Sequence, residues 1–195
     1  MDGLFIINKP RNMTSHDVIF KIRKILQTKK VGHVGTLDPL ATGVLPILIG
    51  KATKISKYLV EHNKEYEAIL QLGEKRDTAD SEGKCIERKN VHNNALEKDM
   101  VEKVLASMLG KQMQIPPMYS AIKVNGKKLY EYARNGLEIK VEPRQIEIFK
   151  LNLINIDNKS KTICINVSCS KGTYIRTLCE DIAEKLGTCR IYERT

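Results

Sequence analysis

The stretch GHVGTLDPLATG, residues 32–43, contains three glycines, one histidine, one proline and a single acid, Asp38. The residue before a proline is restricted to extended backbone geometry, so Asp38 does not lie inside a helix. Gly35 and Gly43 permit tight backbone paths on either side. We therefore expect Asp38 on a loop of restricted shape. An ordinary Asp-Pro turn is the alternative interpretation of the same residues.

The segments on both sides of this loop alternate between strand and helix patterns. LFIINKP (4–10) indicates a strand, TSHDVIFKIRKILQ (14–27) a helix capped by Thr14 or Ser15, and GVLPILIG (43–50) a buried strand or loop. A short helix is expected over 51–63 and a half-buried strand over 64–73, with Tyr66 on its inner face. Residues 74–84 are polar and are expected to form a loop.

The second half of the chain repeats this mixture without a regular order. A helix capped by Asn94 is expected over 93–111, with an apolar stripe of Leu96, Met100, Val104 and Met108. VNGK (124–127) is typical of a hairpin turn. Strands are expected over 144–156 and 161–170, followed by a helix that ends at Gly187. This mixture predicts one α+β domain.

Charge and composition narrow the classes of function. The chain has 195 residues and a net charge of +10, with 42% apolar and 29% charged residues, which is typical of a soluble globular protein. Residues 1–64 hold 11 basic and 4 acidic side chains, a net charge of +7. Such a cluster attracts polyanions, although lysines that only maintain solubility are an alternative. No segment is long and apolar enough for a signal peptide or a membrane span, so we expect a cytoplasmic protein.

Several catalytic and cofactor motifs are absent from the sequence. It contains no GxxxxGK[ST], no GxGxxG after a strand and no HExxH. The five cysteines include no CxxC pair, so neither a zinc site nor a disulfide framework is expected. The remaining candidates are Asp38, Arg176 where a strand becomes a helix, and Tyr66, whose ring could pack in the core or stack on a nucleobase.

Four motifs together resemble a known family. GHVGTLDPLATGVLPILIGKATKISKYL, KEYEAILQLGEKRDTADSEG, IPPMYSAIKVNGKKLYEYARNG and SCSKGTYIRTLCEDIAEKLG resemble the bacterial TruB-type tRNA pseudouridine synthases, and INKPRNMTSHDVIFKIRK resembles the family's opening. The resemblance covers residues 3–187 in order. It implies a pseudouridine synthase fold, with a mixed, mostly antiparallel sheet flanked by helices and a central RNA-binding cleft. It also implies conversion of the T-loop uridine of tRNA, position 55, to pseudouridine, without a metal or organic cofactor.

The resemblance also implies roles for individual residues. Asp38 matches the catalytic aspartate, Arg176 the arginine that pairs with it, and Tyr66 the tyrosine that stacks on the target base. His33 matches a histidine that contacts the flipped-out T-loop, and residues 117–136 match a mobile loop that closes over the RNA. The expected RNA-binding set is completed by Lys9, Gly35, Thr36, Tyr119, Lys123, Lys127, Lys128 and Tyr174.

Family members usually continue beyond the equivalent of IYERT, so residues 1–195 are expected to form a catalytic domain that is incomplete at its C-terminus and lacks a C-terminal RNA-binding domain. The expected partner is the T-arm of tRNA, bound by a monomer. An RNA-binding or tRNA-folding chaperone module with weak or no catalysis is the alternative function. A synthase that works with a guide RNA and partner proteins is a third.

Overall fold

The computed structural model describes residues 1–59, 62–78, 80–81 and 83–194. Backbone contacts divide the chain into two compact units, Met1–His62 and Asn63–Glu193. Each unit has its own hydrophobic core, whereas the sequence suggested one domain. The α+β class and the largely antiparallel pairing are confirmed.

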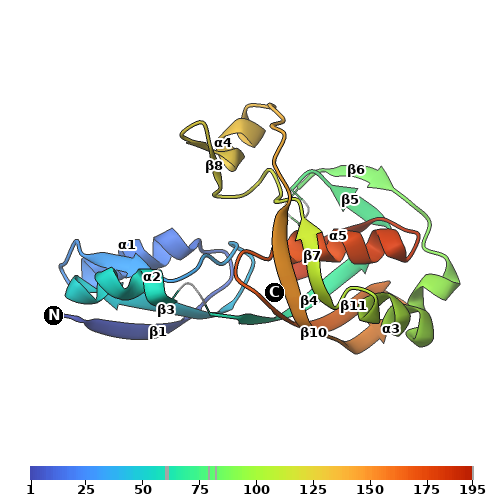
Figure 1. Cartoon of the computed structure of the whole chain (residues 1–195), viewed down its shortest axis with the longest axis horizontal. Helices are drawn as coiled ribbons and strands as arrows, with labels where there is room; N and C mark the ends of the chain where they lie inside the picture. The colour runs from blue at the N-terminus through green and yellow to red at the C-terminus, as the bar shows by residue number, and fades with distance from the viewer. Residues whose placement is uncertain (60–61, 79, 82, 195) are drawn as a thin grey trace. The chain divides into compact units, whose positions relative to one another are not determined.

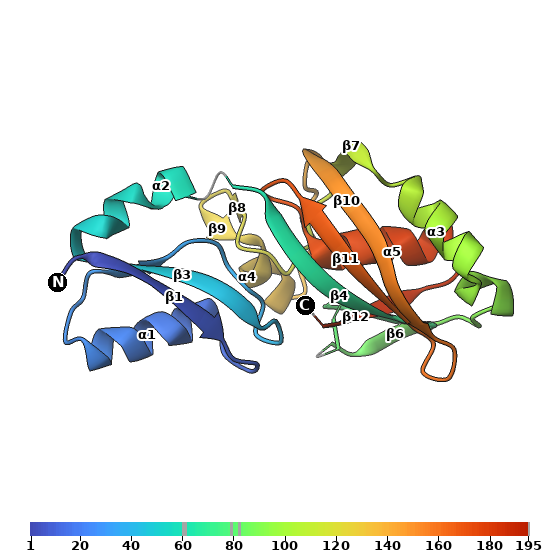
Figure 2. The same ribbon diagram turned by 90° about the horizontal axis from the view of Figure 1, so that it is seen from below.

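The N-terminal unit is a three-stranded antiparallel sheet covered by a helix. Its elements are β1 (Gly3–Lys9), α1 (Ser15–Ile25), β2 (Val31–His33), β3 (Gly43–Ile49), a 3-10 helix (Gly50–Ile55) and α2 (Ser56–Leu59), and the strand order is β1-β3-β2. Figure 2 shows α1 running beside β1 and β3. Helix α1 contributes Val18, Ile19 and Ile22 to a core shared with apolar residues of β2 and β3.

Helix α1 starts at a capping box. The side chain of Thr14 accepts a hydrogen bond from the Asp17 backbone N–H, and the Asp17 carboxylate accepts from the Thr14 N–H and hydroxyl. These hydrogen bonds hold the pKa of Asp17 below its usual value. Thr14 is therefore the cap. Ile25, the last residue of α1, is exposed.

The C-terminal unit is a five-stranded sheet with helices on one face (Figure 1). The strand order is β12-β4-β11-β10-β7, formed by β4 (Lys64–Leu72), β7 (Gly110–Gln114), β10 (Arg144–Asp157), β11 (Thr162–Cys169) and β12 (Arg190–Arg194). Helices α3 (Lys98–Ala106) and α5 (Ile175–Lys185) pack on the sheet through a large apolar core. The inner face of β4 contributes Ala68, Leu70 and Leu72, as its alternating pattern predicted.

Two smaller hairpins complete this unit. One pairs β5 (Glu74–Arg76) with β6 (Cys85–Arg88), so the segment expected to be only a loop begins with a strand. The other pairs β8 (Lys123–Val124) with β9 (Lys127–Lys128) and leads into α4 (Leu129–Arg134). Asn125 and Gly126 both have positive φ, as the predicted VNGK turn requires.

One helix prediction was partly wrong. Residues Asn93–Leu96 form a 3-10 turn, and α3 begins only at Lys98 with Glu97 as its N-cap. Asn94 is therefore not the cap. The buried face of α3 carries Val101, Val104 and Leu105, and Met100 is exposed. The extended backbone of Glu97 separates the 3-10 turn from α3 and sets the start of the helix at Lys98.

No helix in the described part of the chain is long and apolar enough to cross a membrane.

Candidate nucleic-acid interface

The loop that carries Asp38 is held at the residues on both sides of the carboxylate. The Ser15 hydroxyl accepts from the Leu37 N–H (3.0 Å) and donates to the Leu37 carbonyl (3.2 Å). The Pro39 carbonyl accepts from the Asn12 N–H at 2.9 Å. The Asp38 carbonyl itself accepts from the Ala41 N–H at 3.0 Å. The half-buried Asp38 therefore projects from a backbone whose direction is fixed, as the Gly-Pro pattern predicted.

Lys9, at the end of β1, supplies a further support for this loop. Its side chain is 0% exposed. The ammonium donates to three backbone carbonyls, those of Pro10 (3.0 Å), Met13 (2.7 Å) and Pro39 (3.2 Å). Burial lowers the pKa of Lys9 from its usual value, and the negative charges of Asp38 and Asp17 act in the opposite direction. The sequence resemblance predicts Lys9 as an RNA-binding residue. A fully buried ammonium whose three donors are used cannot also contact phosphate, so Lys9 is a positioning residue.

We expect Lys9→Met to destabilise the N-terminal unit by about 2–3 kcal/mol, because it removes the ammonium donor of the Pro10 and Met13 carbonyls and one of the two donors to the Pro39 carbonyl. The measurement is urea unfolding followed by circular dichroism. Lys29→Met, which removes a charge at an exposed position, is the control and should change stability by less than about 0.5 kcal/mol. Equal stability of the Lys9 and Lys29 variants would contradict this role.

His33, Gly35 and Thr36 lie at the start of the same loop. The His33 Nδ1 is hydrogen-bonded to the Gly35 carbonyl, which can only accept, so Nδ1 carries the proton. In the neutral ring, Nε2 is then the acceptor. Gly35 has φ +80°, in the left-handed region that favours glycine. Thr36 is exposed. The end of β2 and the loop that follows it therefore carry His33, Gly35, Thr36 and Asp38, and Lys9 holds this loop at Pro39.

In the C-terminal unit, Arg176 connects two loops. It lies in the first turn of α5 and is 7% exposed. Its Nη1 donates to the Thr78 carbonyl (3.2 Å) and its Nη2 to the Tyr119 carbonyl (2.9 Å), which are 98 and 57 residues away in the sequence. One planar guanidinium therefore fixes the backbone at Thr78 and at Tyr119, in the segment that follows β7.

Tyr66 and Tyr174 come from the same unit. Tyr66, on the inner face of β4, is partly buried against the apolar core. In the antiparallel register of the two strands, it lies opposite Val167 of β11. Tyr174 is the N-cap of α5, and the Gln114 side chain binds both its backbone N–H and its carbonyl. Tyr174 thus immediately precedes the turn that carries Arg176.

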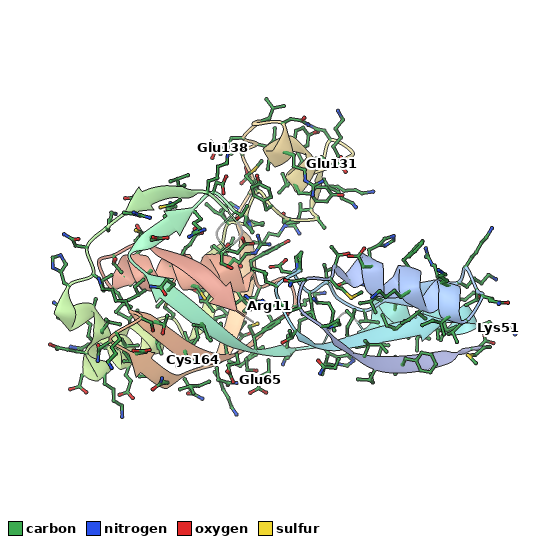
Figure 3. The ribbon with its side chains drawn as sticks, turned by 180° about the vertical axis from the view of Figure 1, so that it is seen from behind. Arg11, Lys51, Glu65, Glu131, Glu138 and Cys164 are labelled. Atoms are coloured by element: carbon green, nitrogen blue, oxygen red, sulfur yellow. The ribbon has the colours of Figure 1, made fainter. Side chains whose placement is uncertain are left out.

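The β8–β9 hairpin concentrates positive charge. Lys123 lies opposite Lys128 in the register, and Lys127 is exposed beside the turn. The acidic residues Glu131 and Glu138 lie in α4 and in the stretch after it (Figure 3). All the charged residues of the hairpin itself are therefore lysines. The Tyr130 ring has Lys128 Nζ at 5.2 Å and the Arg134 guanidinium at 5.3 Å from its centroid. Tyr130 belongs to this basic and aromatic surface and is not among the residues that the sequence predicted for it.

Residues 23–175 match the TruB family pseudouridylate synthase (N terminal domain). The chain belongs to the TruB family of pseudouridylate synthases. This match includes every residue selected from the sequence except Lys9 and Arg176.

Relatives of this TruB-family chain are enzymes of greater length. It is 53% identical over 190 residues to tRNA pseudouridine synthase B of Bacillus subtilis (strain 168) and 51% identical over 187 residues to that of Oceanobacillus iheyensis. Each alignment covers 96% of this chain and 61% of the relative. The chain therefore spans about three fifths of the length of these curated relatives.

Solved structures resemble the TruB-family chain in fold. The crystal structure of a Cbf5-Nop10-Gar1 complex matches 98% of this chain and 46% of the matched chain, with a TM-score of 0.74 and 28% identity. An H/ACA RNP bound to a substrate RNA containing 2'-deoxyuridine matches 98% and 45%, with a TM-score of 0.69 and 26% identity. These similarities agree with the pseudouridine synthase fold predicted from the sequence.

Metal-ligating side chains do not gather in the part of this TruB-family chain that the structure describes: no group of three or more His, Cys, Asp or Glu residues could hold an ion there. Cys169, Cys179 and Cys189 are buried, and Cys85 is exposed. Burial raises the pKa of the Cys169 and Cys189 thiols, which keeps them protonated and poorly nucleophilic.

Proposed function

We propose that this chain is the catalytic part of a tRNA pseudouridine synthase that isomerises the T-loop uridine at position 55, with Asp38 as its catalytic carboxylate. The observation that carries the proposal is the Asp38 loop, whose backbone is held at Leu37 and Pro39 by three separate side chains or backbone groups. Family membership makes pseudouridine formation the reaction for which such a fixed carboxylate is suited. The T-loop site comes from the sequence resemblance.

The isomerisation needs no external reactant because its atoms balance. The bond from ribose C1′ to uracil N1 breaks, the base turns, and C1′ forms a bond to C5. The hydrogen on C5 leaves and N1 gains a proton, so product and substrate have the same composition. An ionised carboxylate could attack the ribose, attack the base or remove a proton, and each of these roles suits Asp38.

The other residues would bring the uridine to the carboxylate. Extrusion of a base from a folded RNA loop costs about a few kcal/mol. Stacking on Tyr66 and insertion of His33 into the vacated space would offset part of that cost. Arg176 would pair with Asp38 and keep it ionised. The two residues belong to different units, so this pairing rests on the resemblance and on the chemistry of the two groups.

The charge distribution suits an RNA partner. The first 64 residues have a net charge of +7, and the β8–β9 hairpin adds three lysines. Phosphate contacts by such residues make binding steeply dependent on salt. tRNA is favoured over a guided RNA substrate because relatives named tRNA pseudouridine synthase B are 48–53% identical, whereas the Cbf5 complexes are 25–28% identical.

We expect the purified chain to form pseudouridine at a single uridine of an unmodified T-stem-loop. The measurement is mass-spectrometric mapping of the RNA after incubation, with a matched stem-loop in which that uridine is cytidine as the control. Binding measured in parallel should weaken as salt is raised, for both RNAs.

Two outcomes would contradict the proposal. Salt-dependent binding without product would favour the RNA-binding module, which uses the same basic surfaces without catalysis. Product at several uridines would exclude the T-loop specificity and leave only a general synthase.

A further inference from the structure

Gln114 has no catalytic chemistry of its own, yet its side chain is among the few polar ones that are buried. It is the last residue of β7, an edge strand of the five-stranded sheet, and is 3% exposed. A buried amide needs partners for both of its polar ends. Here both partners are the backbone of one residue, Tyr174, which is 60 positions away.

The Gln114 amide binds both backbone groups of Tyr174, as the backbone of a neighbouring strand would. Gln114 Oε1 accepts from the Tyr174 N–H at 2.8 Å, and Gln114 Nε2 donates to the Tyr174 carbonyl at 3.1 Å. A backbone N–H only donates and a carbonyl only accepts, so the amide orientation is determined. Tyr174 is the N-cap of α5, and its own side chain makes no capping hydrogen bond. Its carbonyl also accepts from the Leu178 N–H, the first turn of α5, at 3.0 Å.

A second connection runs from α5 back to the segment after Gln114. Arg176 Nη2 donates to the Tyr119 carbonyl at 2.9 Å. Residues 114–119 and 174–176 are therefore joined at both ends, by the Gln114 amide and by the Arg176 guanidinium. Ser170 fixes the start of the segment that leads to Tyr174. Its N–H donates to the Glu147 carbonyl, and its hydroxyl accepts from the Glu147 N–H.

We propose that Gln114 is a positioning residue for the isomerisation, which acts through Arg176 by fixing where the first turn of α5 begins. Its consequence for catalysis rests on the proposed function. Rotation or fraying of that turn would move the guanidinium away from the Thr78 and Tyr119 carbonyls. Among residues of this length, only glutamine offers a donor and an acceptor together. Methionine offers neither, and ionised glutamate offers acceptors alone.

The test compares Gln114→Met with Gln112→Met. Gln112 lies in the same strand, and its side chain donates to the Met108 carbonyl without reaching α5. We expect Gln114→Met to lower the single-turnover rate at saturating T-stem-loop about ten- to a hundredfold, with RNA affinity nearly unchanged. Gln112→Met should remain within about twofold of the parent. Equal losses in the two variants would overturn the proposal.

A double-mutant cycle separates positioning from general stability. If Gln114 acts through Arg176, Gln114→Met should cost less than about twofold in an Arg176→Lys background. The same proportional loss in both backgrounds would overturn the proposal. Gln114→Glu adds a pH profile. The protonated carboxyl has one donor and one acceptor, so its rate relative to the parent should rise as the pH falls. A ratio independent of pH would also overturn it.

Amide hydrogen exchange tests the positioning role of Gln114 without an activity assay, so this inference can fail or hold independently of the proposed function. If the parent forms no pseudouridine, the proposed function fails, and amide exchange at residues 174–178 and 119 then decides the positioning role. We expect faster exchange there in Gln114→Met and no change in Gln112→Met; unchanged exchange would overturn the proposal. Should Gln114→Met not fold, Gln114→Glu at low pH replaces it. If neither variant folds, Gln114 has a structural role only and the proposal is overturned.

Discussion

Asp38→Asn should abolish measurable pseudouridine formation while leaving RNA affinity nearly unchanged. The amide has the size of the carboxylate but lacks its charge, its nucleophilicity and its basicity, and loss of a catalytic acid or base alone costs about 10²- to 10⁴-fold. The backbone of the loop is held at Leu37 and Pro39, so its shape should survive the substitution. Single-turnover assays and filter binding on the T-stem-loop measure the two effects.

The matched control is Asp99→Asn. Asp99 is an exposed residue in the first turn of α3, so its substitution removes the same charge without touching the Asp38 loop. It should turn over at the parental rate. Asp38→Asn activity within about tenfold of this control would remove Asp38 from the catalytic role.

The sequence predicted the Asp38 loop because its determinants are local. The proline after Asp38 restricts the backbone of Asp38, and the glycines at 35 and 43 permit tight turns, whatever surrounds them. Strand β4 was equally predictable from the sequence, because alternation of apolar residues is a local consequence of burying one face of a sheet. The VNGK turn follows from the positive φ that Asn125 and Gly126 tolerate.

The supports of the site were missed because they depend on residues far apart in the sequence. Ser15 reaches Leu37 across 22 positions, and Gln114 reaches Tyr174 across 60. The sequence around Ser15 and around Gln114 contains no local pattern that indicates these long-range contacts. Lys9 was misjudged for a related reason: a lysine in a basic segment suggests phosphate contact, and only the fold shows three carbonyls converging on it.

The start of α3 shows the limit of periodicity. Leu96, Met100, Val104 and Met108 fit a helical stripe only if the helix is continuous from Asn94. The extended backbone at Glu97 interrupts it; Leu96, Val104 and Met108 are buried as expected, Val101 and Leu105 join them in the core, and Met100 is exposed. The spacing of apolar residues thus predicted a helix correctly but not its first residue.

Arg176→Lys should lower the rate of pseudouridine formation about a hundredfold, although it conserves charge. The guanidinium spans two carbonyls, Thr78 and Tyr119, from two different nitrogens. A lysine has one nitrogen on a flexible stem and lacks the planar fork, so it cannot reproduce both contacts and a carboxylate pairing together. A buried carbonyl left without a donor costs about 1–3 kcal/mol, so the unfolding midpoint should also fall.

The substitution should be visible even without catalysis. Loss of the Tyr119 contact frees one end of the segment that leads to the β8–β9 hairpin, so amides of residues 117–136 should exchange faster. Arg88→Lys is the control, because the Arg88 side chain is 75% exposed and its contact with Glu74 tolerates an ammonium. An Arg176→Lys variant with the turnover and the exchange rates of the Arg88→Lys variant would show that the fork geometry of Arg176 is dispensable. In that case the charge alone, rather than the joining of two loops, would account for this arginine at the start of α5.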